Sequence, residues 1–165
     1  MHRGMVVFNL TLPMLPVLNL PPMDARIIGR DGGRKFIFDA LRRRYVPLTP
    51  EEWVRQNFVH FLITEKHYPR SLMANEVELR LNSTRKRCDT VVYDRGLRPR
   101  MIVEYKAPSV AIGQQVFDQI SRYNIVLRVD YLLVSNGMEH YCCRIDYERG
   151  TYTFMREIPT FDGHA

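Results

Sequence analysis

Three charged residues interrupt two apolar segments of the sequence, RCDTVVYD (87–94) and MIVEYKA (101–107). Glu104 and Lys106 are two residues apart, so on a strand both side chains leave the same face. Asp89 lies on the first segment, and pairing of the two segments in the right register would bring its carboxylate near Glu104. Burial of unpaired charges is expensive. The pattern therefore indicates either a network of ion pairs or a site that binds something charged.

Two carboxylates at close range repel each other unless a cation lies between them. Mg²⁺ is the natural cation, because it binds one or two carboxylates, several waters and phosphate oxygens. Asp89 and Glu104 would then be the metal ligands. Lys106 would orient or deprotonate an attacking water, or stabilise charge on a phosphoryl group. Glu and Lys also occur two apart on solvated edge strands, so structural salt bridges are the alternative interpretation of this candidate catalytic set.

Both segments belong to a run of three predicted strands. Residues 75–82, NEVELRLN, alternate between apolar and polar or charged, which is typical of a strand with one buried face. A turn at Asn82-Ser83 leads towards 87–94, and the loop RGLRPR leads into 101–107. These short connections predict an antiparallel meander, which places the two charged segments side by side.

One helix is predicted before these strands and one after them. The first follows Thr49, a good N-cap, with Pro50 at the first helical position and Glu52 completing a T-x-x-E capping box. The second covers residues 108–129 and carries apolar residues at helical spacing. The apolar stripe of the first helix consists of Val54, Phe58, Phe61 and Leu62.

The remaining segments complete a mixed sheet. Residues 130–137 are a near-continuous apolar run, which is typical of a buried central strand. Further strands are predicted around the turn at Arg149-Gly150. The order of elements predicts an α/β fold, a central mixed β-sheet flanked by helices, in a single domain over residues 25–165. Residues 29–48 combine turn-forming residues, alternating apolar positions at Phe36 and Phe38 and a short basic stretch, and receive no firm assignment.

Residues 1–24 are predicted to form an extended, Pro-rich arm, packed on this domain from about residue 12. Their basic start and apolar run are also found in secretion signals, but polar residues and prolines interrupt the run and no small-residue cleavage site follows. The run is too short and broken to span a bilayer, so no membrane association is expected. Whether residues 1–13 belong to the natural protein is left open.

The net charge of +6 is unevenly distributed. Residues 1–106 hold 19 Lys or Arg against 11 Asp or Glu, whereas residues 107–165 hold 5 against 7. A one-sided basic surface suits a polyanion such as nucleic acid, and a solvated basic face is the alternative. The basic clusters are Arg34-Lys35, Arg42-Arg43-Arg44, Arg85-Lys86-Arg87 and the group Arg95, Arg98 and Arg100.

The three cysteines do not indicate a disulfide framework, because their number is odd and Cys142 and Cys143 are adjacent. No second pair of Cys or His completes a tetrahedral zinc site. Together with Cys88 they are expected to be reduced core residues of a cytoplasmic protein.

Five segments of the chain, in this order, resemble the PD-(D/E)xK nuclease superfamily. More closely, the chain is similar to small stand-alone proteins related to the N-terminal nuclease domain of type I restriction enzyme R subunits. The similarity spans about residues 12–146. The segments are LTPEEWVRQNFVHFLI, NEVELRLNSTRKRCDTVVYD, IVEYKAP, FDQISRYN and YLLVSNG.

The resemblance implies a restriction-endonuclease-like sandwich and a nuclease that hydrolyses DNA with Mg²⁺, for which Mn²⁺ can substitute. Asp89 matches the acidic residue of the superfamily, and Glu104 and Lys106 match its E-x-K. Gln119 and Tyr123, four residues apart on one helix face, match the Q-x-x-x-Y motif of the RecB-like branch, whose residues contact substrate. A core aromatic is the alternative role for Tyr123.

The superfamily often adds an acidic residue from the first helix. The capping box explains Glu52, so Glu51, which projects nearer the apolar stripe, is the better candidate. Glu76 is a second candidate, and an exposed strand charge is its alternative role. Cys88 stands where the motif has Pro, while both charges of the E-x-K are kept.

The sequence contains no G-x-x-x-x-G-K-[ST] segment, so it carries no motif for an ATP-driven motor. Translocation along DNA would therefore require restriction-modification or helicase subunits as partners. Two functions fit these observations. The first is an endo- or exonuclease that acts on DNA, and the second is a non-catalytic nucleic-acid-binding or accessory module that retains the fold.

Overall fold

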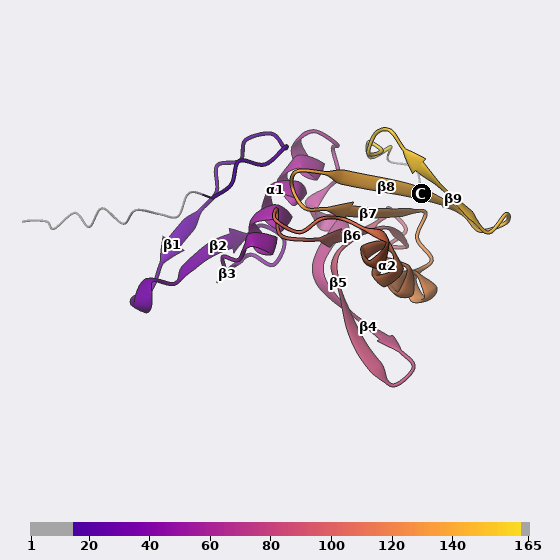
Figure 1. Ribbon diagram of the computed structural model, residues 1–165, viewed down its shortest axis with the longest axis horizontal. Coiled ribbons are helices and arrows are strands. Elements are labelled where there is room, and N and C mark those ends of the chain that lie inside the picture. Colours follow the sequence, from indigo (N-terminus) through magenta and orange to yellow (C-terminus); the bar gives the residue numbers. More distant parts are fainter. Residues whose placement is uncertain (1–14, 163–165) are drawn as a thin grey trace, which may run out of the picture.

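The structure, a computed structural model, describes residues 15–162. The strands of its central sheet are β4 (Met73–Leu81), β5 (Thr84–Tyr93), β6 (Pro99–Tyr105), β7 (Tyr131–Ser135), β8 (His140–Asp146) and β9 (Thr151–Met155). They lie in the order β4-β5-β6-β7-β8-β9 (Figure 1). The helices are α1 (Pro50–Thr64) and α2 (Gln114–Leu127), with short 3₁₀ turns at η1 (Asp31–Gly33) and η2 (Arg70–Leu72).

The sheet is mixed because α2 connects β6 to β7, which run parallel, while the other neighbouring strands are antiparallel. The predicted meander (β4-β5-β6) and the predicted buried central strand (β7) are confirmed. The helix predicted over 108–129 begins later, at Gln114. The chain first turns, with the amide of Val110 donating to the carbonyl of Ala107 at 2.9 Å, and Gly113 precedes the helix in an extended conformation.

The N-terminus of α1 is capped as predicted, but only half of the capping box forms. Thr49 Oγ1 accepts a hydrogen bond from the amide of Glu52 at 3.0 Å. The Glu52 carboxylate does not return to the backbone of the cap; it accepts from Gln56 Nε2 at 2.8 Å and from Arg42 Nη2 at 3.2 Å. Thr49, Pro50 and Glu51 are exposed, but Glu52 is buried. A buried carboxylate is better stabilised by a guanidinium than by an amide.

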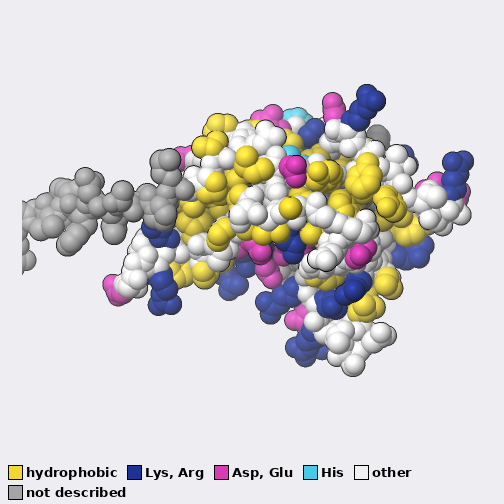
Figure 2. All heavy atoms as spheres, viewed as in Figure 1, with side chains coloured by type: hydrophobic (Ala, Val, Ile, Leu, Met, Phe, Trp, Pro, Cys, Tyr) yellow, Lys and Arg dark blue, Asp and Glu magenta, His cyan; other side chains and the backbone are white. Residues whose placement is uncertain are grey.

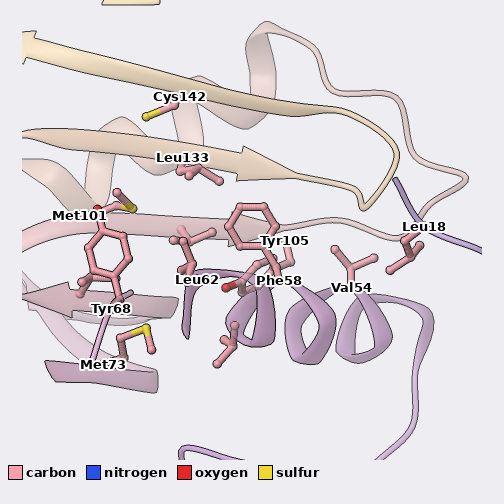
Figure 3. Close-up of a cluster of buried hydrophobic side chains, with 13 residues drawn as sticks. Leu18, Val54, Phe58, Leu62, Tyr68, Met73, Met101, Tyr105, Leu133 and Cys142 are labelled. Atoms are coloured by element: carbon pink, nitrogen blue, oxygen red, sulfur yellow. The ribbon is translucent and has the colours of Figure 1, made fainter. Parts of the chain in front are cut away.

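The two helices cover opposite faces of the sheet, and each builds its own apolar core. Val54, Phe58 and Leu62 of the predicted stripe are buried with side chains from β6 and β7 (Figure 3), whereas Phe61 is partly buried. Ile120 of α2 lies at the centre of the second core. Successive residues of β6 alternate between the two cores, so each second residue of this strand faces α2.

A separate three-stranded antiparallel sheet precedes α1 and comprises β1 (Ile27–Gly29), β2 (Lys35–Asp39) and β3 (Arg44–Pro47). Its strands lie beside α1 (Figure 1). This sheet was not predicted, because its strands have only three to five residues and basic turns separate them. Such short segments give too few alternations to be recognised by periodicity.

The turn between β2 and β3 depends on Asp39, whose side chain is fully buried. Its Oδ1 accepts hydrogen bonds from the amides of Leu41 and Arg42, both at 2.8 Å. Its Oδ2 accepts from Asn75 Nδ2 and pairs with the Arg42 guanidinium. Arg42, predicted as part of a basic cluster for a polyanion, is therefore a structural residue of this turn.

The described part of the predicted N-terminal arm, residues 15–24, contains no helix or strand and packs on the domain. Trp53 Nε1 of α1 donates to the carbonyl of Pro16 at 3.0 Å, and Leu18 is buried beside Gly137. Gly137 has a φ of +83°, and a Cβ at this position would lie 2.7 Å from the Leu18 side chain. The close approach of the arm therefore requires glycine here. The first half of the predicted arm lies outside the described residues.

Cys88, Cys142 and Cys143 are buried and free of disulfides, which confirms their prediction as core residues. Neither α-helix in the part of the chain that the structure describes is long and apolar enough to cross a membrane.

Candidate active site

Asp89 and Glu104 lie on the neighbouring strands β5 and β6. The pairing of β5 with β6 ends at Thr90 and Val103, and Asp89 and Glu104 are the next residues beyond this last pair. Asp89 Oδ2 accepts a hydrogen bond from the amide of Tyr105 at 2.8 Å. The strand pairing therefore brings the aspartate to the E-x-K segment, as expected from the sequence.

Lys106 directly follows β6, and its ammonium joins a polar network with α2. Lys106 Nζ lies 3.4 Å from Glu104 Oε1 and donates to Gln119 Oε1 at 3.3 Å. Gln119 Nε2 donates to Glu104 Oε1 at 2.9 Å and lies 3.3 Å from the hydroxyl of Tyr123. Tyr123 is also part of the apolar core under α2, so its ring and its hydroxyl have different environments. Gln119 and Tyr123 of the Q-x-x-x-Y motif therefore lie next to the charged residues of the E-x-K motif.

Burial raises the pKa values of both carboxyl groups, and the negative charges of neighbouring acids add to the effect. Glu104 is 4% exposed, and its burial, together with the negative charge of Asp89, raises its pKa to about 8 although Lys106 acts in the opposite direction. Burial also raises the pKa of Asp89, against the lowering effects of the Tyr105 amide and of Arg55. Ionisation of both carboxyl groups is unfavourable in the free protein. A cation bound between them would stabilise their ionised forms.

The donor atoms of this pair fit a Mg²⁺ site of two carboxylates completed by water. Glu104 Oε2 is buried and has no hydrogen-bond partner among residues 15–162, and such an orphaned oxygen is unfavourable unless it binds something. Mg²⁺ takes oxygen ligands and is commonly held by only one or two carboxylates. The described residues contain no group of three or more His, Cys, Asp and Glu able to hold a metal, so a closed protein cage is not formed in this part of the chain.

The raised pKa of Glu104 makes a prediction for the pH dependence of stability. Between the ordinary value of 4.5 and about 8 the unfolded chain loses this proton while the folded protein keeps it, so the free energy of unfolding falls as pH rises through this window. Each pKa unit corresponds to about 1.4 kcal/mol. Glu104→Gln is therefore expected to be more stable than the wild type at pH 8, and about equal at pH 4. Urea unfolding at several pH values measures the difference.

Mg²⁺ provides the matched test, because a metal that binds the ionised carboxylates stabilises the folded state by mass action. At pH 8 the wild type should gain stability with Mg²⁺ and Glu104→Gln should gain much less. Equal pH dependence in the two proteins would show that Glu104 does not retain its proton in the folded state.

Arg55 of α1 is central to this site and was not identified from the sequence. Its Nη2 lies 2.6 Å from Glu76 Oε1 and 3.7 Å from Asp89 Oδ1, and its Nη1 donates to the carbonyl of Asp89 at 3.0 Å. Its Nε lies 3.5 Å from Glu52 Oε2. One buried guanidinium therefore compensates three acids. The sequence held one sign of this role: Arg55 directly follows Val54 of the apolar stripe. An arginine buried at such a position requires acidic partners.

The two additional acidic candidates occupy different positions. Glu76 shares the guanidinium of Arg55 with Asp89, whereas Glu51 is exposed in the first turn of α1. The negative charges of both raise the pKa of Asp89, and that of Glu51 also acts on Glu104. Glu76 is thus tied to the site through Arg55, while Glu51 acts on it electrostatically.

Residues 50–159 match the family model described as the type I restriction enzyme R protein N terminus. Among solved structures, the chain resembles a fragment of a protein assigned as an HsdR subunit of a type I restriction enzyme from Vibrio vulnificus YJ016, with a TM-score of 0.50 and 20% sequence identity. The match covers 68% of this chain and 24% of that one, so the chain spans about a quarter of its structural relative. The predicted restriction-endonuclease-like fold is confirmed. No curated protein matches the chain.

Proposed function

The chain belongs to the family of type I restriction enzyme R protein N termini, and we propose that it is a Mg²⁺-dependent nuclease that hydrolyses DNA phosphodiester bonds. The observation that carries this proposal is the meeting of Asp89 and Glu104, both with raised pKa values, beside the ammonium of Lys106. A purely structural ion-pair network would satisfy every carboxylate oxygen. Glu104 Oε2 is buried without a donor among the described residues, which favours a binding site over a set of salt bridges.

Asp89 and Glu104 are the proposed ligands for Mg²⁺, and Mn²⁺, which also prefers oxygen ligands, can substitute. The bound metal supplies Lewis-acid polarisation of a phosphoryl oxygen and lowers the pKa of a bound water. Asp89 is held for this role by the Tyr105 amide and by Arg55. Arg55 is a positioning residue, because its donors are directed at protein acids.

Lys106 is proposed to act on the attacking water and on the phosphoryl group. Its positive charge orients the water and stabilises the negative charge that develops on phosphoryl oxygen. Gln119 binds both Lys106 and Glu104, so it fixes the ammonium relative to the carboxylate. The hydroxyl of Tyr123 lies next to Gln119, and we assign these two residues to substrate contact.

We further propose DNA as the substrate, with restriction-modification or helicase subunits as partners wherever translocation is required. Family membership supports DNA as the substrate. Partner subunits are proposed for translocation because the sequence carries no nucleotide-binding P-loop motif.

The test is cleavage of supercoiled plasmid and of linear single-stranded DNA by the purified protein with Mg²⁺, with Mn²⁺ and with EDTA. We expect nicking or degradation with either metal and none with EDTA, because two carboxylates alone cannot polarise the phosphodiester. Tight binding without cleavage under every metal condition would instead support the non-catalytic nucleic-acid-binding module.

A further inference from the structure

The β4–β5 hairpin projects from the body of the domain, and its tip lies far from α1 and from the small sheet (Figure 1). Its strands pair continuously from Val77↔Cys88, close to the domain, to Leu81↔Thr84 at the tip. Lys and Arg side chains gather around this projection at the bottom of the view in Figure 2. The proposed active site uses none of these basic residues.

Alternation along β5 places two arginines on one face of the hairpin, and ion pairs connect that face to Asp89. Arg85 and Arg87 are two residues apart, so their side chains leave the same face of the strand. Arg87 lies 3.9 Å from Glu76, which shares the Arg55 guanidinium with Asp89. Cys88 leaves the other face and is buried in the core under α2, which fixes the orientation of the ribbon. The register adds Arg80 directly opposite Arg85. We call Arg80, Arg85 and Arg87 the arginine face.

The positive charge of the arginine face is only partly compensated, because Glu76 and Glu78 lie on the same face and Glu78 is directly opposite Arg87. Arg80 and Arg85 are like charges in a directly opposed cross-strand pair, which is destabilising in the free protein. No carboxylate among the described residues lies within ion-pairing distance of Arg80. Arg85 lies 3.6 Å from Glu78 and Arg87 lies 3.9 Å from Glu76, but their side chains are 69% and 67% exposed. Ion pairs this exposed contribute little to stability. An anion that binds the guanidinium groups more tightly than these carboxylates can therefore displace them.

We propose that the arginine face binds the phosphate backbone of duplex DNA on one side of the cleavage site and so aligns the DNA with Asp89. This inference rests on the proposed function. A strand rise of about 3.4 Å per residue places Arg87 about 7 Å and Arg85 about 14 Å from Asp89 along the ribbon. Guanidinium groups bind phosphate oxygens in a bidentate manner. The three arginines therefore form a track that leads into the site.

Two features favour duplex DNA as the ligand of this track. The hairpin positions on this face, 76, 78, 80, 85 and 87, hold no aromatic side chain, whereas single-strand binding surfaces combine basic residues with aromatics on which bases stack. A two-stranded β-ribbon has the width to lie in the major groove of a duplex. The contacts are to phosphates, so the arginine face confers affinity and direction but no sequence preference.

The experiment measures the affinity of the intact protein for a labelled 20-base-pair duplex in EDTA, where no cleavage occurs, over a series of salt concentrations. The triple variant Arg80→Ala/Arg85→Ala/Arg87→Ala is compared with the wild type. We expect at least about tenfold weaker binding at low salt, and a slope of log affinity against log salt that is smaller by about 3, one for each lost phosphate contact.

The matched control is Arg144→Ala/Arg149→Ala/Arg156→Ala, which removes the same charge from exposed positions at the β8–β9 end of the molecule. Its salt slope should stay within about 1 of the wild type. A second variant replaces the arginine face with three lysines, which keeps the charges and should restore most of the slope. This variant separates loss of contacts from damage to the hairpin.

Cleavage is measured separately, so that the two proposals can fail independently. If the wild type cuts no DNA with any metal while the alanine variant loses duplex binding, the nuclease proposal fails and the arginine face stands. If the wild type cuts DNA while the alanine variant binds the duplex no worse than the control variant, the arginine face is overturned. Tighter binding of a single-stranded 20-mer than of the duplex by the wild type also overturns it.

Discussion

Asp89→Asn is expected to reduce the rate of Mg²⁺-dependent DNA cleavage by at least about 10³-fold, and Lys106→Ala by about 10²- to 10⁴-fold. Asparagine keeps the size of the side chain and an oxygen that can accept from the Tyr105 amide, now at 2.8 Å. It lacks the negative charge that a divalent cation requires. The initial rate of plasmid nicking measures both effects, with the same substrate and metal as for the wild type.

Stability distinguishes a lost reaction from a lost fold. Because burial raises the pKa of Asp89, its neutral replacement should be at least as stable as the wild type near neutral pH. Asp118→Asn, at an exposed position of α2, is the matched control and should cut at the wild-type rate. Cleavage by Asp89→Asn within tenfold of the wild type would contradict the assignment of this carboxylate as a metal ligand.

Arg55→Met is expected to lower the free energy of unfolding near pH 7 by about 3–5 kcal/mol, the usual consequence of removing one partner of a buried ion pair. Arg55 is 6% exposed and lies within ion-pairing distance of Glu52, Glu76 and Asp89. Methionine keeps most of the packing of the side chain but leaves these acids without their cation. Urea unfolding of the variant and the wild type gives the difference.

Two further variants test this explanation. Arg55→Met combined with Glu76→Gln should recover part of the loss, because it removes one of the uncompensated charges. Arg122→Met, at an exposed position of α2, should change stability by less than about 0.5 kcal/mol. A loss of under about 1 kcal/mol in Arg55→Met would mean that the three acids do not depend on this guanidinium.

The parts of the fold that the sequence predicted are those with strong local signals. Thr49 and Pro50 marked the start of α1, and alternation marked β4, which the turn at Asn82-Ser83 connects to β5. The apolar run of β7 indicated its central place in the sheet. These signals depend on a few neighbouring residues, so no knowledge of tertiary contacts was needed.

The parts that were missed depend on contacts between distant residues. Asp39 stabilises the small sheet partly through Asn75, which is 36 positions away. Arg55 meets its acidic partners only when α1, β4 and β5 pack together. Its partner Glu76 lies 21 positions later in the chain. The family resemblance identified Asp89, Glu104 and Lys106 through its motifs. None of these motifs includes a buried arginine between the acids, so Arg55 was not found.

The contact between Leu18 and Gly137 links two positions that are far apart in the chain. A side chain at position 137 would collide with Leu18, and the φ of +83° there already disfavours most residues. A relative with a side chain at position 137 is therefore expected to have a smaller or shifted side chain at position 18. These two positions are expected to diverge together during evolution, and a bulky residue at both in one homologue would imply a different path for the leading segment.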